Sequence, residues 1–297
     1  MVEFNFLISQ RFSGLSMFLR AKNIILTAIG LCIMSMTVFA LPDGSKASQD
    51  ERQWNKQVRV IYNSIDFKNV DRLPFYVFEK AYRGYYNLKS EGRLNAENET
   101  LTVCDFDLPS TENRMWIIDL ATHKVLFNTY VAHGQGTGED CAEKFSNKFN
   151  SHQSSVGFYV TGDTYNGEHG LSLRLEGVDE GFNSAARPRG IVVHGASYVN
   201  EDFVTGNIRL GRSWGCPAVP DKLKIPIINA IQGGTCLFIY FPQKDYLEKS
   251  YWLNKNPQDN AVNLLSTMQL PIEPGKVKYI VEYTHGSTVD STKTFYK

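Results

Sequence analysis

The sequence predicts a mainly β fold, a sandwich or barrel-like domain with short helices, preceded by a helical region. Two observations support this prediction. After about Leu101, apolar residues recur in many short, strand-like runs separated by Gly-rich links. Before that point, residues 45–92 carry a helical pattern. We therefore expect a signal peptide (1–40), a helical region packed on the core (41–100), the main domain (101–251) and a C-terminal extension (252–297).

The first forty residues have the pattern of a secretory signal peptide. Arg20 and Lys22 precede an apolar run over residues 24–39, which ends at Ala40 just before a turn-forming segment. The run is short for a membrane span, which needs about 20 apolar residues, so we favour cleavage near Ala40 over a signal anchor. The sequence thus predicts an exported protein of the periplasm or cell envelope.

Charge and cysteine content narrow the class of protein further. The 31 basic and 31 acidic residues balance, whereas nucleic-acid binding usually needs a basic face, so we expect no nucleic-acid partner. Cysteines outside the cytosol invite disulfides. If Cys216 stays free, at most one internal bridge can form among Cys104, Cys141 and Cys236, and the sequence does not specify the pair.

The helical region carries an aromatic stripe. Pro74 suits a first helical turn, and Gly92 is a plausible stop. We expect the stripe to pack on the main domain rather than to bind a ligand. Its members recur at spacings of three, four and three: Phe75, Phe78, Tyr82 and Tyr85.

The strand-like runs of the main domain are short. Residues 114–120 and 124–131 flank a polar link and predict a hairpin. Residues 225–232 predict a short helix, opened by Pro226 and closed by two glycines. Further strands are expected at residues 156–161, 171–175, 189–194 and 235–241, with one more at 277–283 in the tail.

A histidine is a candidate general base. His194 follows the apolar run Ile191–Val193, and we expect it at the end of that strand, where Gly195 lets the chain turn. A strand terminus is a rigid support for a side chain that points into a cleft. Alone, such a histidine more often has a structural role, so its significance depends on a partner.

The candidate partner is Cys216, which lies between Gly215 and Pro217. The proline favours an extended backbone and excludes a helix N-terminus, so a reactive thiolate would need a base beside it. The amides of Trp214, Gly215 and Cys216 are candidates to stabilise an oxyanion. The hypothesis requires the imidazole of His194 to lie within hydrogen-bonding reach of the Cys216 sulfur.

Together these elements resemble the L,D-transpeptidase catalytic domain of the YkuD type, whose signature is His-Gly followed by Ser-His-Gly-Cys. More closely, Gly-Arg-Ser-Trp-Gly-Cys-Pro-Ala at residues 211–218 resembles a divergent branch of that group. The similarity extends over roughly Leu101 to Tyr251 and includes residues 131–134, 145–147 and 154–159.

The resemblance implies a peptidoglycan enzyme with transpeptidase or carboxypeptidase activity. In that family a thiolate attacks a tetrapeptide stem, expels D-alanine and forms a thioester, which an amine of a second stem or water resolves. Cys216 would be the nucleophile and His194 the base and later acid, with Ser213 and Gly215 in the loop that shapes the oxyanion hole. No metal or organic cofactor is implied, and a β-lactam such as a carbapenem could acylate Cys216.

Two positions depart from the family pattern. Trp214 replaces the second histidine, and Ala218 replaces an arginine two residues after the cysteine. Trp214 can pack against a substrate but has no acid–base function near pH 7. Anion recognition would then fall to Arg212 or Arg209.

Other residues could contact the substrate. His133 precedes a glycine as His194 does, so it could orient a substrate carboxylate or have a structural role. The substrate-binding residues that we expect are Arg212, His133 and Gly195.

Two alternative functions remain open. A zinc-dependent wall peptidase is one, although the sequence has no His-Glu-x-x-His helix or close pair of ligands. The other is a catalytically silent peptidoglycan-binding module of the same fold, which the two departures would explain. The zinc ligands would come from His133, His152, Asp163, His169, His194 and Cys216.

Overall fold

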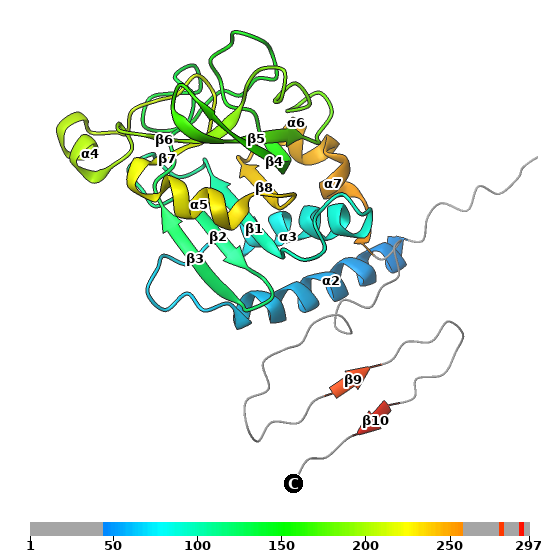
Figure 1. Ribbon diagram of the computed structural model, residues 1–297. Helices are drawn as coiled ribbons and strands as arrows, with labels where there is room; N and C mark the ends of the chain where they lie inside the picture. The colour runs from blue at the N-terminus through cyan, green and yellow to red at the C-terminus, as the bar shows by residue number, and fades with distance from the viewer. Residues whose placement is uncertain (1–43, 258–278, 282–290, 294–297) are drawn as a thin grey trace, which may run out of the picture. The chain divides into compact units, whose positions relative to one another are not determined.

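The computed structural model describes residues 44–257, 279–281 and 291–293 (Figure 1). The predicted signal peptide lies outside the described residues. The chain divides into two compact units, residues 1–49 and 50–297, and the fold below concerns the second. Within the described residues, no helix has the length and apolar character needed to cross a bilayer.

An eight-stranded mixed sheet forms the centre of the fold, in the order β3-β2-β1-β8-β4-β5-β6-β7. Isolated bridges join Ala132 to Ala218 and Gly134 to Ser213, so the segment after β3 meets β7 and nearly closes the sheet into a barrel. The predicted mainly β, barrel-like fold is confirmed. The strands are β1 (Thr100–Asp105), β2 (Met115–Asp119), β3 (Lys124–Thr129), β4 (Gly157–Gly167), β5 (Gly170–Gly177), β6 (Val192–Ala196), β7 (Ala218–Pro220) and β8 (Cys236–Tyr240).

Strand β8 separates two parts of the core. All five of its residues are buried, as expected for an apolar run covered on both faces. Leu237 and Ile239 belong to a cluster with β5 and β6, whereas Phe238 and Tyr240 belong to the cluster under the helices. Phe238 stacks on Phe158 of β4 with ring centroids 4.1 Å apart.

Two helices cover one face of the sheet. Helix α2 (Gly44–Ser64), of which residues 50–64 belong to this unit, precedes α3 (Phe75–Ser90), which packs on β1 and β8 (Figure 1). Phe78, Tyr82 and Tyr85 of the predicted aromatic stripe are buried in this contact. Gly84 lies so close to the Phe158 ring that a Cβ would approach it within 2.0 Å, so glycine permits the helix to sit on the sheet.

Short helices connect the remaining strands. The predicted helix at 225–232 is present as α5, and residues 279–281 of the predicted tail strand form β9. Strands β9 (Tyr279–Val281) and β10 (Ser291–Lys293) pair as a separate two-stranded sheet. The other helices are α4 (Glu201–Asn207), η1 (Asp221–Leu223), α5 (Lys224–Ile231), α6 (Lys244–Lys249) and α7 (Tyr251–Asn254).

The position of β6 corrects one prediction. The strand begins at Val192 and continues to Ala196, so His194 lies at its centre and not at its end. The chain turns instead at Gly190, whose φ is +71°. Gly195 lets Asp221 and Lys224 pack closely on β6, because a Cβ there would lie 2.7 Å from both Asp221 Oδ1 and Lys224 Cδ.

The described cysteines are all free. Cys104 and Cys236 are buried in β1 and β8, Cys141 is exposed and Cys216 is half-buried.

Candidate active site

Cys216 lies in a turn just before β7, beside the start of β6. Strands β6 and β7 are parallel with His194 opposite Ala218, which puts the cysteine turn next to the strand of the histidine. The sulfur accepts a hydrogen bond from the Val192 amide at 3.5 Å and donates one to the Gly190 carbonyl at 3.7 Å. Burial raises the pKa of this thiol, while the Val192 amide and the charge of Arg189 oppose that rise.

Hydrogen bonds fix the turn that carries the sulfur. Ser213 Oγ accepts from the Gly215 amide at 3.1 Å and donates to the Cys216 carbonyl at 2.7 Å. Gly215 has a φ of +125°, and a Cβ there would lie 2.7 Å from the Gln153 carbonyl oxygen. Only glycine fits this position without strain.

The amides of this turn differ in their availability. The Gly215 amide is already bonded to Ser213, so it is not free to stabilise an oxyanion in this state. The Trp214 and Cys216 amides donate no hydrogen bond within the described part of the chain. Two of the three amides that the sequence suggested therefore remain available.

His194 is buried and held in one tautomer. Its Nδ1 lies 2.9 Å from the Gly195 carbonyl, which can only accept, so Nδ1 carries the proton of the neutral ring and Nε2 is the basic nitrogen. The ring of His169 stacks on it with centroids 4.2 Å apart. Burial, followed by the charges of His169 and Lys224, lowers the pKa of His194. The imidazole is therefore neutral at pH 7, as a general base must be.

The expected hydrogen bond between His194 and Cys216 is absent from the described structure. The sulfur is bonded to Val192 and Gly190, whereas the ring is held by Gly195 and His169. Catalytic hydrogen bonds are often long or unmade before substrate binds, so this geometry leaves the pairing as a hypothesis.

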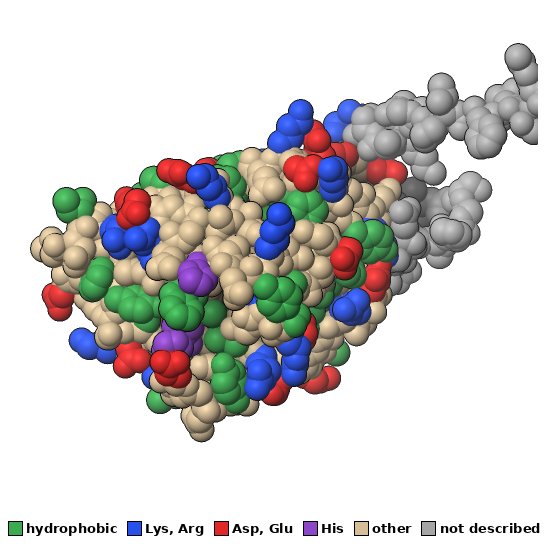
Figure 2. Space-filling model, turned by 90° about the horizontal axis from the view of Figure 1, so that it is seen from above, with side chains coloured by type: hydrophobic (Ala, Val, Ile, Leu, Met, Phe, Trp, Pro, Cys, Tyr) green, Lys and Arg blue, Asp and Glu red, His purple; other side chains and the backbone are tan. Residues whose placement is uncertain are grey.

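Trp214 forms an exposed aromatic pair beside the cysteine. Its side chain is 71% exposed and stacks on His152 with centroids 4.9 Å apart and an interplanar angle of 4°. Gln135 Nε2 donates to His152 Nδ1 at 2.9 Å and fixes that ring. On the face seen in Figure 2, histidines lie next to hydrophobic side chains. The pair is available for contact with a bound molecule.

His133 has a structural environment. It is fully buried, with Arg114 Nη2 2.7 Å from its Nδ1 and the Glu139 carbonyl 3.1 Å from its Nε2. Burial, followed by the Arg114 charge, lowers its pKa to about 3. Both ring nitrogens are engaged by the protein, so neither is free to orient a substrate.

The two arginines expected to recognise an anion share an exposed carboxylate. Arg212 lies 2.8 Å and Arg209 3.0 Å from the oxygens of Glu139, whose side chain is 73% exposed. Arg212 also donates to the Gly138 carbonyl. A substrate anion would have to compete with Glu139 for both charges. Gly195 is buried within β6 and contacts Asp221 and Lys224.

Sequence reasoning missed two residues of this region, Tyr198 and Arg189, and named a third, His169, only as a possible zinc ligand. His169 covers His194 from the β4–β5 turn. Tyr198 follows β6, and burial and then the charge of Cys216 raise the pKa of its hydroxyl to about 12. Arg189 influences the thiol electrostatically. Arg189 directly precedes the Gly190–His194 segment, but nothing in the sequence distinguishes it from the nearby Arg187.

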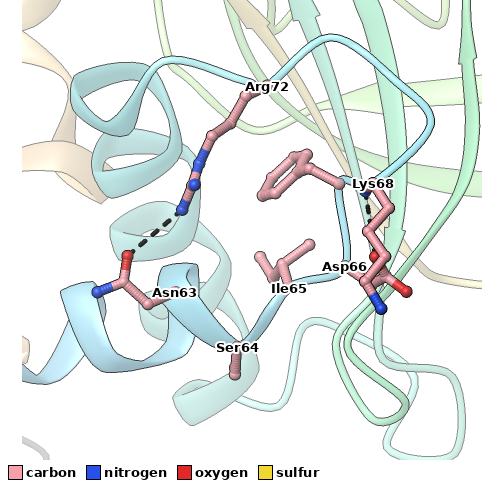
Figure 3. A pocket seen from close by; sticks show the side chains of 7 residues that line it. Asn63, Ser64, Ile65, Asp66, Lys68 and Arg72 are labelled. Carbon is pink, nitrogen blue, oxygen red and sulfur yellow. Dashed lines mark hydrogen bonds between the residues drawn. The ribbon is translucent and has the colours of Figure 1, made fainter.

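A hollow lies at the end of α2 and shares no residue with the cysteine turn. In Figure 3, Arg72 donates to Asn63 Oδ1 and the Lys68 amide donates to Asp66 Oδ1. It contains no nucleophilic cysteine or histidine. Its lining residues are Asn63, Ser64, Ile65, Asp66, Phe67, Lys68 and Arg72. Among the described residues, no group of three or more His, Cys, Asp or Glu side chains is arranged to hold a metal ion.

The structure is a nearly closed barrel that brings a His-Gly segment next to a Ser-x-Gly-Cys segment. Together these features define the class of protein. Residues 69–240 match the family described as L,D-transpeptidase catalytic domain. The match covers more than half of the chain, so the protein belongs to this family. It begins ahead of α3, so that helix falls within the matched region.

Comparison with solved structures finds partial similarity. One is an L,D-transpeptidase from Mycobacterium smegmatis, with 14% identity and a TM-score of 0.30. Another is the LD transpeptidase LdtMt1 in complex with imipenem, with 11% identity and a TM-score of 0.30. Each comparison covers 48% of this chain and 59% of the other protein. No curated protein matches the chain.

Proposed function

We propose that the protein is a peptidoglycan L,D-transpeptidase or L,D-carboxypeptidase that works through a thioester on Cys216. The sulfur attacks the carbonyl carbon between the third and fourth residues of a tetrapeptide stem. The peptide C–N bond breaks, and D-alanine leaves with the proton that His194 took from the thiol. An amine of a second stem, or water, then attacks the thioester and the C–S bond breaks. Family membership supports this reaction class.

The observation that carries the proposal is the placement of the basic nitrogen. Gly195 fixes the proton on Nδ1 of His194, which leaves Nε2 without a partner in the described part of the chain. The register of β6 and β7 puts this ring on the strand next to the cysteine turn. Pairing with His194 would require the Cys216 side chain to rotate away from the Gly190 carbonyl, to which the thiol donates in this structure.

The oxyanion of the tetrahedral intermediate needs donors near the sulfur. The amides of Trp214 and Cys216 are the available ones, and Ser213 holds the turn that orients them. The exposed indole of Trp214 would contact the stem. This division of roles follows the general need for preorganised donors in acyl transfer.

The test is to incubate full-length mature protein with tetrapeptide muropeptides and identify the products by mass spectrometry. Cross-linked dimers would show transpeptidation, and tripeptides would show carboxypeptidase action. Cys216→Ala and His194→Ala should each abolish both products, while Cys141→Ala, which removes an exposed cysteine, should retain them. Unchanged substrate with the folded wild-type protein would instead favour a silent peptidoglycan-binding module.

Export to the periplasm or cell envelope is part of the proposal, because the substrate lies outside the cytosol. The basic and apolar residues before Ala40 support it. The N-terminus of the protein isolated from the envelope should lie at about Leu41. A protein that keeps the apolar run at residues 24–39 would contradict cleavage, and one that stays in the cytosol would contradict export.

A further inference from the structure

Arg189 is held rigidly beside the cysteine turn. It is half-buried and lies in the turn that leads into β6. Its Nη1 donates to the Ser146 carbonyl at 2.8 Å and to Ser155 Oγ at 2.6 Å. Its Nη2 donates to Ser151 Oγ at 3.2 Å and to the Gln153 carbonyl at 2.7 Å. Four hydrogen bonds thus fix the guanidinium on the 146–155 loop.

The same contacts connect Arg189 to the sulfur from two directions. The Gln153 carbonyl that accepts from Arg189 also lies against Gly215, the residue before Cys216. Gly190, the next residue along the chain, accepts the hydrogen bond of the Cys216 thiol. Burial raises the pKa of that thiol, and the charge of Arg189 opposes this rise. Burial lowers the pKa of Arg189, and negative charge on Tyr159 and Cys216 opposes that fall.

The positive charge of Arg189 has no counter-ion in the described structure. All four of its acceptors are neutral oxygens. Neighbouring arginines differ: Arg187 pairs with Glu176 and Asp163, and Arg212 pairs with Glu139. A partly buried cation without a carboxylate partner favours the ionised form of a nearby acid. The nearby acid here is the thiol of Cys216.

The hydrogen bonds argue against a direct role in binding a substrate carboxylate. A guanidinium has five N–H donors, and four of those of Arg189 are already used within the protein. Bidentate recognition of a carboxylate needs two parallel donors. The one remaining N–H cannot provide them.

We propose that Arg189 is a positioning residue that holds the 146–155 loop against the cysteine turn and supplies the positive charge that stabilises the Cys216 thiolate. A cysteine that precedes proline has no helix dipole to do this. The inference rests on the proposed function only in taking Cys216 as the reactive thiol. Among the described residues, Tyr198 interacts electrostatically with Cys216 and Tyr159 with Arg189. His194 lies opposite Ala218 on the neighbouring strand, and His152 stacks on Trp214.

The test measures the reactivity of the thiol and not the turnover of a wall substrate. The full-length protein is alkylated with iodoacetamide over a range of pH, and the rate at Cys216 is read from its peptide by mass spectrometry. Arg189→Gln should raise the midpoint of the rate profile by about one pH unit, which is about a tenfold slower reaction below the midpoint. Alkylation of the exposed Cys141 provides an internal reference.

Arg187→Gln is the matched control, because it removes an arginine charge two residues away that is already paired. It should leave the Cys216 midpoint unchanged. A folded Arg189→Gln protein with the wild-type midpoint would overturn the proposal. Because no peptidoglycan is needed, a protein that fails to process muropeptides can still show the shift, so the two proposals fail separately.

A second variant keeps the test decisive if Arg189→Gln does not fold. The double substitution Ser151→Ala with Ser155→Ala removes two of the four acceptors and loosens the guanidinium while keeping its charge. The midpoint should move in the same direction by a smaller amount, with circular dichroism confirming the fold. An unchanged midpoint here would equally reject the role of Arg189.

Discussion

Substitution of Gly215 by alanine should disable the cysteine turn through a steric conflict that the structure defines. The positive φ of +125° is unfavourable for any residue with a Cβ, and this costs about 1 kcal/mol. The added methyl would also lie 2.7 Å from the Gln153 carbonyl and 3.1 Å from Ile191 Cδ1. Arg189 holds that carbonyl, so it cannot move freely. Overpacking of this kind adds about 1–3 kcal/mol.

We therefore expect Gly215→Ala to lower the free energy of unfolding by about 2–4 kcal/mol, measured by urea denaturation, and to reduce turnover of muropeptides at least about tenfold. Gly181→Ala is the matched control, because Gly181 has a φ of +78° but no atom within 4 Å of the point that an added Cβ would occupy. The free energy of unfolding of this variant should fall by only about 1 kcal/mol. Equal stability of the two variants would refute the reasoning, since the steric part would then be absent.

Three further predictions follow from buried polar groups. Burial raises the pKa of Asp179 from 3.8 to about 6, so the folded protein keeps this carboxyl protonated at pH values where the unfolded chain ionises it. The free energy of unfolding therefore falls as pH rises from about 4 to about 6. Asp179→Asn should remove up to about 3 kcal/mol of that pH dependence, measured by urea denaturation at pH 4 and pH 7. His169→Ala removes the ring stacked on His194 and should raise the pKa of His194, which an NMR titration of the imidazole would report. Arg114→Met leaves the Val131 carbonyl and His133 without their buried partner. It should destabilise the fold by about 3 kcal/mol in thermal or chemical unfolding.

Much of the fold follows from local patterns in the sequence. Strand β8 is a continuous apolar run because it is buried on both faces, and β5 alternates because one face is less covered. The aromatic spacing of α3 identifies its buried face correctly. Such patterns record which side of an element meets the core, and this can be read without knowing the partner.

The details of the site depend on contacts between distant segments. His194 lies inside β6 because this strand pairs with β7 as far as Ala196, and no local pattern indicates this pairing. The pairing of Arg212 with Glu139 joins residues 73 positions apart. The acceptors of Arg189 lie 34 to 43 positions before it. A single sequence carries little information about which donors and acceptors meet at such separations.

The most direct test of the central claim is covalent labelling of Cys216 by a carbapenem. We predict that the intact mass of the mature protein increases by one carbapenem and that peptide mapping places the adduct on Cys216. The adduct should be missing from Cys216→Ala and should form much more slowly in His194→Ala. A folded wild-type protein that gains no mass, or that carries the adduct on Cys141 instead, would contradict the assignment of Cys216 as the nucleophile.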